Sequence, residues 1–239
     1  TIGMKTAVLK VTQTGPGGSA DALIVYANDM DNGKVEKVNG YWPYLDQSDS
    51  WRNEKGSGIK NVSYSSNGVS VRSVSSTNNL FFPAKGGSYF TIHDIALNSA
   101  KSLELSFATV HGSTNGYKKT FDESKFKVFL SKDNEKWVEL PYELTVNADN
   151  EFDTASSAFT VDGVDNLSVA FQFLGAEDGY RLTRINLSLY SGSDAGAVDF
   201  SNATDVDFGS SSGGDTPAAG QPETLKKVTI KAFLAAPVS

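Results

Sequence analysis

Short segments in which apolar and polar residues alternate constrain the fold of this chain more than any other feature. Leu103, Leu105 and Phe107 alternate with polar residues, and segments 125–130 and 167–173 repeat the pattern. A period of two with one apolar face is typical of half-buried antiparallel strands. Many short strands of this kind predict a β-sandwich or barrel. Turn-forming dipeptides separate the strands: Asn32-Gly33, Asn39-Gly40, Asn67-Gly68, Asn115-Gly116, Asp162-Gly163 and Asp178-Gly179.

The alternation changes phase once, near the end of the predicted sandwich. Tyr180 and Leu182 share one parity, whereas Ile185 and the apolar residues after it have the other. A slip of one residue would turn a whole apolar face toward water unless a β-bulge absorbs it. We therefore predict a bulge at Thr183-Arg184.

The chain divides into one large body and three shorter segments. We expect the sandwich over 20–200, one predicted strand within 1–14, a flexible linker over 201–222 that is rich in Gly, Ser and Pro, and the start of a following domain over 223–239. The chain then reads as part of a longer protein. The predicted core includes Leu23, Val25, Phe107, Phe126, Val128, Phe171 and Leu187.

Charge and composition exclude several classes of function. The formal net charge is −7 and the isoelectric point is near 4.9, which argues against binding to nucleic acid or to anionic membrane surfaces. Cysteine is absent, so disulfides, thiol nucleophiles and thiolate metal sites are excluded. A cysteine-free β protein rich in Ser, Thr, Asn and Gly suits an exported bacterial protein, although a cytosolic origin stays open.

Two clusters are candidates for binding. Asn28, Asp29 and Asp31 gather oxygen atoms at a predicted strand end and form a candidate calcium site, with an ordinary Asx turn as the alternative. No other cofactor is expected. The aromatic residues Trp42, Tyr44 and Trp51 lie in a loop region beside carboxylates, a composition suited to stacking on sugars, or alternatively to plugging one end of the core.

Catalytic patterns are missing from the sequence. His93 and His111 are the only histidines, and no Gly-x-Ser-x-Gly nucleophile motif accompanies them. Carboxylate pairs such as Asp149 and Glu151 lie in polar turns where water would solvate them, and a glycosidase needs a facing pair with one raised pKa. Trp137 follows Ser131-Lys-Asp133 in a predicted hairpin, where we expect its ring to pack on neighbouring strands. We therefore expect no enzymatic activity.

Several stretches resemble known families. Residues 5–13, KTAVLKVTQ, resemble the last strand of the BACON domain, an immunoglobulin-like module. The body resembles the jelly-roll, galactose-binding-like domains (choice-of-anchor type) of Bacteroidetes surface lipoproteins. The matching stretches include YANDMD at 26–31, GYWPY at 40–44, NLFF at 79–82 and YRLTRI at 180–185. Residues 228–234 resemble the lead-in to an OB-like domain. Relatives often have two aspartates where this chain has Thr183 and Arg184, which argues against a cation site there.

This resemblance implies an antiparallel jelly-roll β-sandwich within a multidomain lipoprotein on the outer-membrane surface, attached only through the lipid anchor of the parent chain. From it and the residues together we expect a noncatalytic module that binds carbohydrate or acts in adhesion, with a glycan or a surface protein as partner. The second alternative is a structural spacer that presents a neighbouring domain. The third is an enzyme that acts on glycans.

Overall fold

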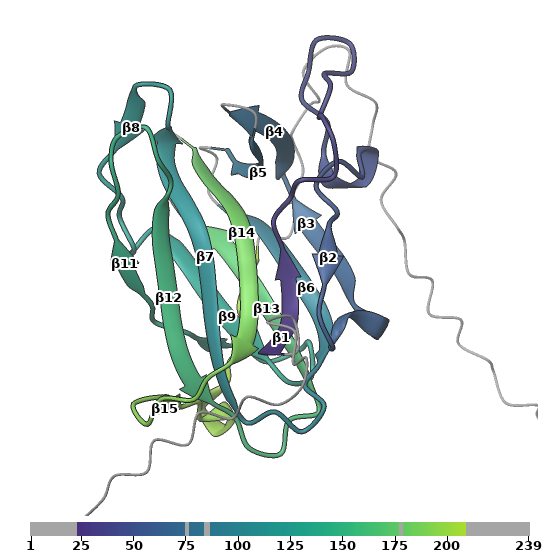
Figure 1. The fold of residues 1–239 in the computed structure, drawn as a ribbon, viewed down its shortest axis with the longest axis vertical. Helices are drawn as coiled ribbons and strands as arrows, with labels where there is room; N and C mark the ends of the chain where they lie inside the picture. Colours follow the sequence, from purple (N-terminus) through teal and green to yellow (C-terminus); the bar gives the residue numbers. More distant parts are fainter. Residues whose placement is uncertain (1–22, 75–76, 84–86, 177–178, 209–239) are drawn as a thin grey trace, which may run out of the picture.

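The fold is a sandwich of two β-sheets, as Figure 1 shows. The computed structural model describes residues 23–74, 77–83, 87–176 and 179–208. The helices that lie wholly within these residues are short 3₁₀ turns: η2 (Leu45–Gln47), η3 (Ile59–Asn61) and η4 (Phe200–Asn202). None of them has the length and apolarity that crossing a membrane requires. The predicted all-β class is confirmed.

The first sheet has ten strands, of which β11-β12-β7-β14-β1-β2 form the main path. Its other strands are β15 beside β12, β8 beside β7, and the hairpin β4-β5, of which β5 pairs with β14. The strands of this sheet are β1 (Ile24–Asn28), β2 (Glu54–Lys55), β4 (Ser70–Val74), β5 (Thr77–Phe82), β7 (Ser102–Ser113), β8 (Tyr117–Lys119), β11 (Glu143–Thr145), β12 (Asp153–Thr160), β14 (Tyr180–Leu189) and β15 (Gly196–Ala197).

The second sheet has five strands in the order β10-β9-β13-β6-β3. They are β3 (Ser63–Asn67), β6 (Ser88–Ala96), β9 (Phe126–Ser131), β10 (Val138–Glu139) and β13 (Asn166–Phe173). Along the chain β6, β7, β9, β12, β13 and β14 alternate between the two sheets, which is the wrapping of a jelly roll. The jelly-roll expectation is therefore confirmed.

The core lies between the sheets and is built from the residues whose alternation predicted strands. Aromatic rings fill one part of it: Phe126 stacks on Tyr180, and Phe107 packs edge-to-face on Phe171. Six of the seven expected core residues are buried. The seventh, Leu23, is 56% exposed, because it precedes the first residue of β1 and lies outside the sheet. That prediction was wrong.

The predicted bulge is present in β14. Its pairing with β7 shifts register between Thr183 and Asn186, and Arg184 has a φ of +50°. Tyr180 and Leu182 before the shift and Ile185 and Leu187 after it are all buried in the core, so the bulge keeps both parities facing inward. The phase change was thus correctly interpreted from the sequence.

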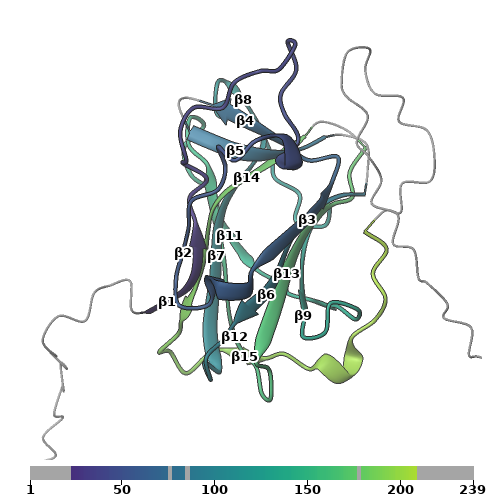
Figure 2. The ribbon, with the colours of Figure 1, turned by 90° about the vertical axis from the view of Figure 1, so that its right-hand side faces the viewer.

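The ordered body continues past its predicted end at residue 200. Residues 204–208 cross the outer face of the five-stranded sheet, and Figure 2 shows this segment running along the side that faces away from the other sheet. Thr204 exchanges two backbone hydrogen bonds with Trp137, and the Phe208 ring packs edge-to-face on the Trp137 ring. The prediction of a linker beginning at 201 is corrected for these residues. The segments 1–14 and 223–239 lie outside the described residues.

Candidate functional site

An open groove of about 560 Å³ lies on the outer face of the ten-stranded sheet. Ala108 of β7 and Thr154 of β12 are direct partners in its floor. Their side chains point away from the core, because the adjacent residues Phe107 and Ala155 belong to the core. The β4-β5 hairpin forms one wall and the loop after β11 forms the other, at the upper end of the sandwich in Figure 1. The groove is lined by Val74, Thr77, Ala108, Thr114, Asn147, Asn150, Glu151, Phe152, Thr154 and Arg184.

The groove combines an apolar floor with a polar rim. Phe152 packs on Ala108 and Val110 to form a small hydrophobic cluster that is separate from the main core. Around this cluster stand the amides of Asn147 and Asn150 and further hydroxyl, carboxylate and guanidinium groups. An apolar surface with a few convergent polar groups is the usual make-up of a small-ligand site.

Arg184 enters the groove because of the bulge. Its guanidinium carbon lies 5.8 Å from the centre of the Phe152 ring, a cation–π contact, and the residue is exposed. A left-handed backbone at a non-glycine residue costs about 1–2 kcal/mol. Bulges that redirect a side chain are over-represented beside functional sites. The bulge therefore has a consequence beyond register, because it directs the one arginine of the lining into the groove.

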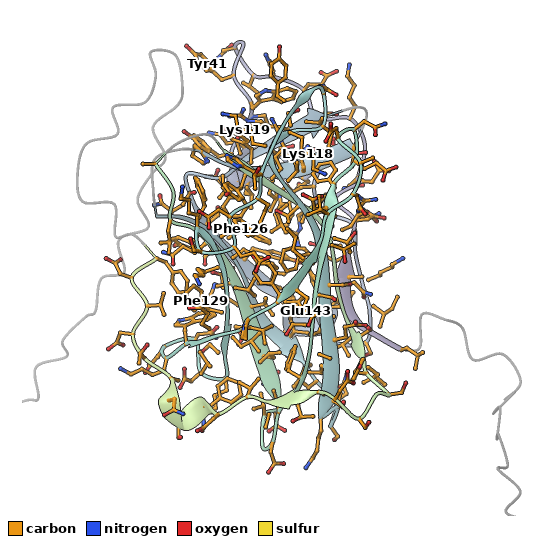
Figure 3. All side chains as sticks on the ribbon, turned by 90° about the vertical axis from the view of Figure 1, so that its left-hand side faces the viewer. Tyr41, Lys118, Lys119, Phe126, Phe129 and Glu143 are labelled. Atoms are coloured by element: carbon orange, nitrogen blue, oxygen red, sulfur yellow. The ribbon has the colours of Figure 1, made fainter. Side chains whose placement is uncertain are left out.

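A buried lysine holds the loop that forms the opposite wall. Lys118 Nζ lies 2.6 Å from Asp153 Oδ1 and also donates to the carbonyl oxygens of Asn147, Ala148 and Glu151 at 2.9, 3.1 and 3.3 Å. Figure 3 places Lys118 toward the same end of the sandwich as Tyr41. Asp153 Oδ1 in turn accepts the backbone N–H of Asn147. The ammonium thus holds the two ends of segment 147–153 together and orders this wall of the groove.

The three predicted sugar-stacking residues do not form one surface. Trp51 is only 3% exposed; its indole N–H donates to the Leu45 carbonyl, and its ring packs edge-to-face on Tyr64 and Phe90. The prediction that it stacks on a ligand is corrected, because the ring is buried and the guanidinium carbon of Arg52 lies 5.8 Å from its centre. Trp42 and Tyr44 are half-buried, with Lys37 Nζ 5.1 Å from the centre of the Trp42 ring.

The predicted calcium ligands form a tight turn at the end of β1. Asn28 Oδ1 accepts the backbone N–H groups of Met30 and Asn53, and Asp29 Oδ1 accepts from the Asp31 N–H and the Asn53 side-chain amide. Each of these two oxygens already has two donors, which is the arrangement of the alternative Asx turn. In the described ranges, no group of three or more His, Asp or Glu residues could hold a metal ion. Calcium binding here stays a prediction.

His93 has partners that its sequence neighbours did not reveal. Ser65 Oγ lies 2.7 Å from His93 Nε2, and His93 Nδ1 lies 2.8 Å from Asn134 Oδ1. This Ser-His-Asn order resembles that of a nucleophilic triad. Ser65, however, lies inside the regular strand β3 rather than on a strand-to-helix turn that presents free backbone N–H groups as an oxyanion hole. The hydroxyl of Ser168 also donates to Asn134 Oδ1, so the set forms a hydrogen-bonded network across the sheet face.

The predicted hairpin around Asp133 is confirmed. Asp133 Oδ1 accepts the backbone N–H groups of Lys136 and Glu135, and these hydrogen bonds hold the pKa of the carboxyl below its ordinary value. Trp137 is 5% exposed and packs with Phe129 and Phe208 on the outer face of the five-stranded sheet. Its role is therefore structural in this conformation.

No family model and no curated protein matches this chain. Among solved structures it is similar to the C-terminal CBM6 of LamC, a marine laminarinase from Zobellia galactanivorans, at 17% identity over 54% of this chain and 99% of that chain, with a TM-score of 0.36.

Two further solved structures show likenesses of the same strength. The CBM22-1 xylan-binding domain of Xyn10C from Paenibacillus barcinonensis has 11% identity over 73% of this chain and 100% of that chain, with a TM-score of 0.38. TmCBM61, solved with β-1,4-galactotriose, has 13% identity over 55% and 90%, with a TM-score of 0.31. Likenesses this weak do not bear on what this chain binds, so we infer its function from its own residues.

The sequence contained one signal for the groove. The phase change at Thr183-Arg184 located the bulge, and bulges often redirect side chains at functional sites. Nothing local pointed to the opposite wall: residues 147–152 form a polar turn in the sequence, and their anchor Lys118 lies about thirty residues away. Only the pairing of β7 with β8 and of β7 with β12 brings the lysine to this loop.

Proposed function

We propose that this chain is a noncatalytic carbohydrate-binding module, and that its ligand occupies the groove on the outer face of the ten-stranded sheet. The observation that carries the proposal is Arg184, which a strained bulge directs into a groove floored by Phe152. Sugars offer apolar C–H faces and many hydroxyls. The amides of Asn147 and Asn150, the Glu151 carboxylate and the Arg184 guanidinium suit the hydroxyls, whereas Phe152 and Ala108 are mostly buried beneath them.

A glycan array on the 239-residue chain, followed by calorimetry on the glycans that bind, tests this proposal. Arg184→Gln and Asn150→Ala should each weaken binding by about tenfold, because each removes a hydrogen-bonding group from the rim. Arg52→Gln is the matched control, since Arg52 pairs with Glu54 and is not part of the groove lining. If all three variants bind the glycan as tightly as the wild type, the ligand lies elsewhere. The loop with Trp42 and Tyr44 is then the next candidate.

A structural spacer is the second candidate function, and the segment 204–208 favours it. The hydrogen bonds of Thr204 to Trp137 and of the Gln172 side chain to the Asp207 carbonyl tie this segment to the sandwich. Such an attachment would fix the direction in which the chain leaves the domain. A complete absence of glycan binding on the array, with the fold intact, would favour the spacer.

Location and further partners belong to the same proposal. A glycan-binding module of this kind would work outside the cell, on the outer-membrane surface, as part of a lipoprotein that has its own lipid anchor. A surface protein is the alternative partner. Surface labelling of cells that express the full-length parent protein would test the location.

A further inference from the structure

Three of the four arginines of this acidic chain share the outer face of the ten-stranded sheet. Arg72 lies on β4, and Arg181 and Arg184 lie on β14. Arg181 is the direct cross-strand partner of Phe81, and both flank core residues, so both side chains leave the sheet on its outer side. The fourth arginine, Arg52, lies in the loop before β2 and pairs with Glu54.

Two of these guanidinium groups gather on one aromatic ring. The guanidinium carbon of Arg72 lies 3.5 Å from the centre of the Phe81 ring, and that of Arg181 lies 4.9 Å from it. Among the described residues their hydrogen-bond acceptors are neutral: Arg72 donates to Ser70 Oγ, and Arg181 donates to the Gly112 carbonyl and to Asn79 Oδ1.

No carboxylate neutralises these charges within the part of the chain that the structure describes. None of the three arginines makes an ion pair with a described Asp or Glu. By contrast, Arg52 and six of the described lysines do. Burial lowers the pKa of both Arg72 and Arg181 to about 10, and for Arg72 the charge of Arg181 adds to this effect. Two neighbouring cations that are only partly solvated lower the stability of the fold unless an anion neutralises them.

The arginines adjoin both candidate binding surfaces. Arg184 lies in the groove, where Glu151 is the single carboxylate of the lining. Tyr44 forms an isolated β-bridge with Ser70 on β4. It also lies close enough to Arg72 to raise the pKa of that guanidinium electrostatically. The guanidinium fork matches the planar geometry of carboxylate and the oxygens of sulfate, for which it is the preferred side chain. The cationic face thus extends from the aromatic loop to the groove.

We propose that the outer face of the ten-stranded sheet selects acidic glycans, whose carboxylate or sulfate groups bind Arg72 and Arg184. The buried Arg181 adds positive electrostatic potential without contacting the glycan. This inference rests on the proposed function and names the ligand class. The overall charge of −7 would repel a polyanion at long range, so such binding requires a local cationic face of this kind.

Matched pairs of polysaccharides test the charge requirement. Calorimetry in 0.15 M NaCl compares polygalacturonate with its fully methyl-esterified form, and dextran sulfate with dextran, so that the carboxylate and sulfate sources are separated. At least one anionic member should bind about tenfold or more tightly than its neutral partner. The affinity should fall steeply at 0.5 M NaCl, because salt screens exposed charge. Equal affinity within both pairs would overturn the inference.

Substitutions locate the binding face. Arg72→Gln and Arg184→Gln should each weaken binding of the anionic polysaccharide about tenfold, and Arg52→Gln should leave it unchanged. Far-ultraviolet circular dichroism and thermal melts verify that each variant is folded. An equal loss in Arg52→Gln would reveal nonspecific attraction and overturn the inference. Binding of neutral glycans that depends on Asn150 but not on charge would refute the acidic ligand and keep the proposed function. If the folded wild-type chain binds no glycan, both the acidic ligand and the proposed function are refuted.

Discussion

The ammonium of Lys118 lies 2.6 Å from the carboxylate of Asp153, and the two side chains are 6% and 1% exposed. Three backbone carbonyls complete the shell of the ammonium. A lone buried charge would be very costly, but here each ion is both paired and hydrogen-bonded. The pair therefore fixes the conformation of the loop 147–152, as a bound metal ion does in other proteins. It thereby gives the groove a wall of defined shape.

Replacing this lysine should destabilise the fold. In Lys118→Met the apolar stem is kept and the Asp153 carboxylate is left buried without its partner, which should lower the free energy of unfolding by about 3–5 kcal/mol. The control is Lys101→Met, because the Lys101–Asp162 pair has 71% and 90% exposed side chains and should contribute little to stability. Urea unfolding of both variants measures the difference. Similar small losses would contradict a structural role for Lys118.

The strain at Arg184 should be visible in its substitutions. Because φ is +50° there, Arg184→Asn should leave the free energy of unfolding within about 0.5 kcal/mol, since Asn tolerates the left-handed region. Arg184→Val should cost about 1–2 kcal/mol, since a β-branched residue is disfavoured there. Chemical denaturation compares the two variants, and equal costs would argue against the bulge geometry. Both variants should bind glycan about tenfold more weakly than the wild type, as Arg184→Gln should.

Trp51 and Trp137 should both matter for stability. Each ring is buried, Trp51 in the main core and Trp137 beneath Phe208, so truncation to Ala should cost about 3–5 kcal/mol in either case. Thermal melts and urea titrations measure the two losses. A Trp51→Ala variant with wild-type stability and weakened glycan binding would restore the stacking role that its burial excludes.

Alkaline pH should destabilise the fold through Tyr26. Burial raises its pKa from 10 to about 12, and its hydroxyl lies 3.2 Å from that of Tyr64. The unfolded chain then releases its proton first, so the contribution is intact below pH 10 and is lost as the pH rises through 12. The free energy of unfolding should fall by up to about 1.4 kcal/mol per pH unit for this group. Tyr26→Phe should show a shallower fall, and an unchanged slope would exclude Tyr26 as a source.

No hydrolysis is expected from the Ser65-His93 pair. Because Ser65 lies in a regular strand and not on a turn that aims backbone N–H groups at an oxyanion, its hydrogen bond to His93 should not make it a nucleophile. The test is turnover of an activated ester such as p-nitrophenyl acetate and of several polysaccharides by the wild type and by Ser65→Ala. Turnover that disappears in Ser65→Ala, with thermal stability unchanged, would show that the network is catalytic.

The sequence by itself determined the layers of this protein and one of its irregularities. Alternation around Phe107, Phe126 and Phe171 identified strands with one buried face, because a period of two commits each side chain to one side of a sheet. The same logic located the bulge before Ile185. It misplaced Leu23, because an apolar residue just outside a strand has no sheet to bury it. These are local consequences of chain geometry, and a single sequence contains them.

Only the tertiary structure decided where the candidate site lies. Trp51 was indistinguishable from Trp42 in the sequence, since both are loop tryptophans, and only the packing against Phe90 buried the former. The groove depends on Lys118 reaching a loop about thirty residues away, and the arginine face depends on β5 lying between β4 and β14. Hydrogen bonds and ion pairs act over a few ångströms regardless of chain distance. Which of them form is therefore set by the strand order, and the alternation of residues does not encode that order.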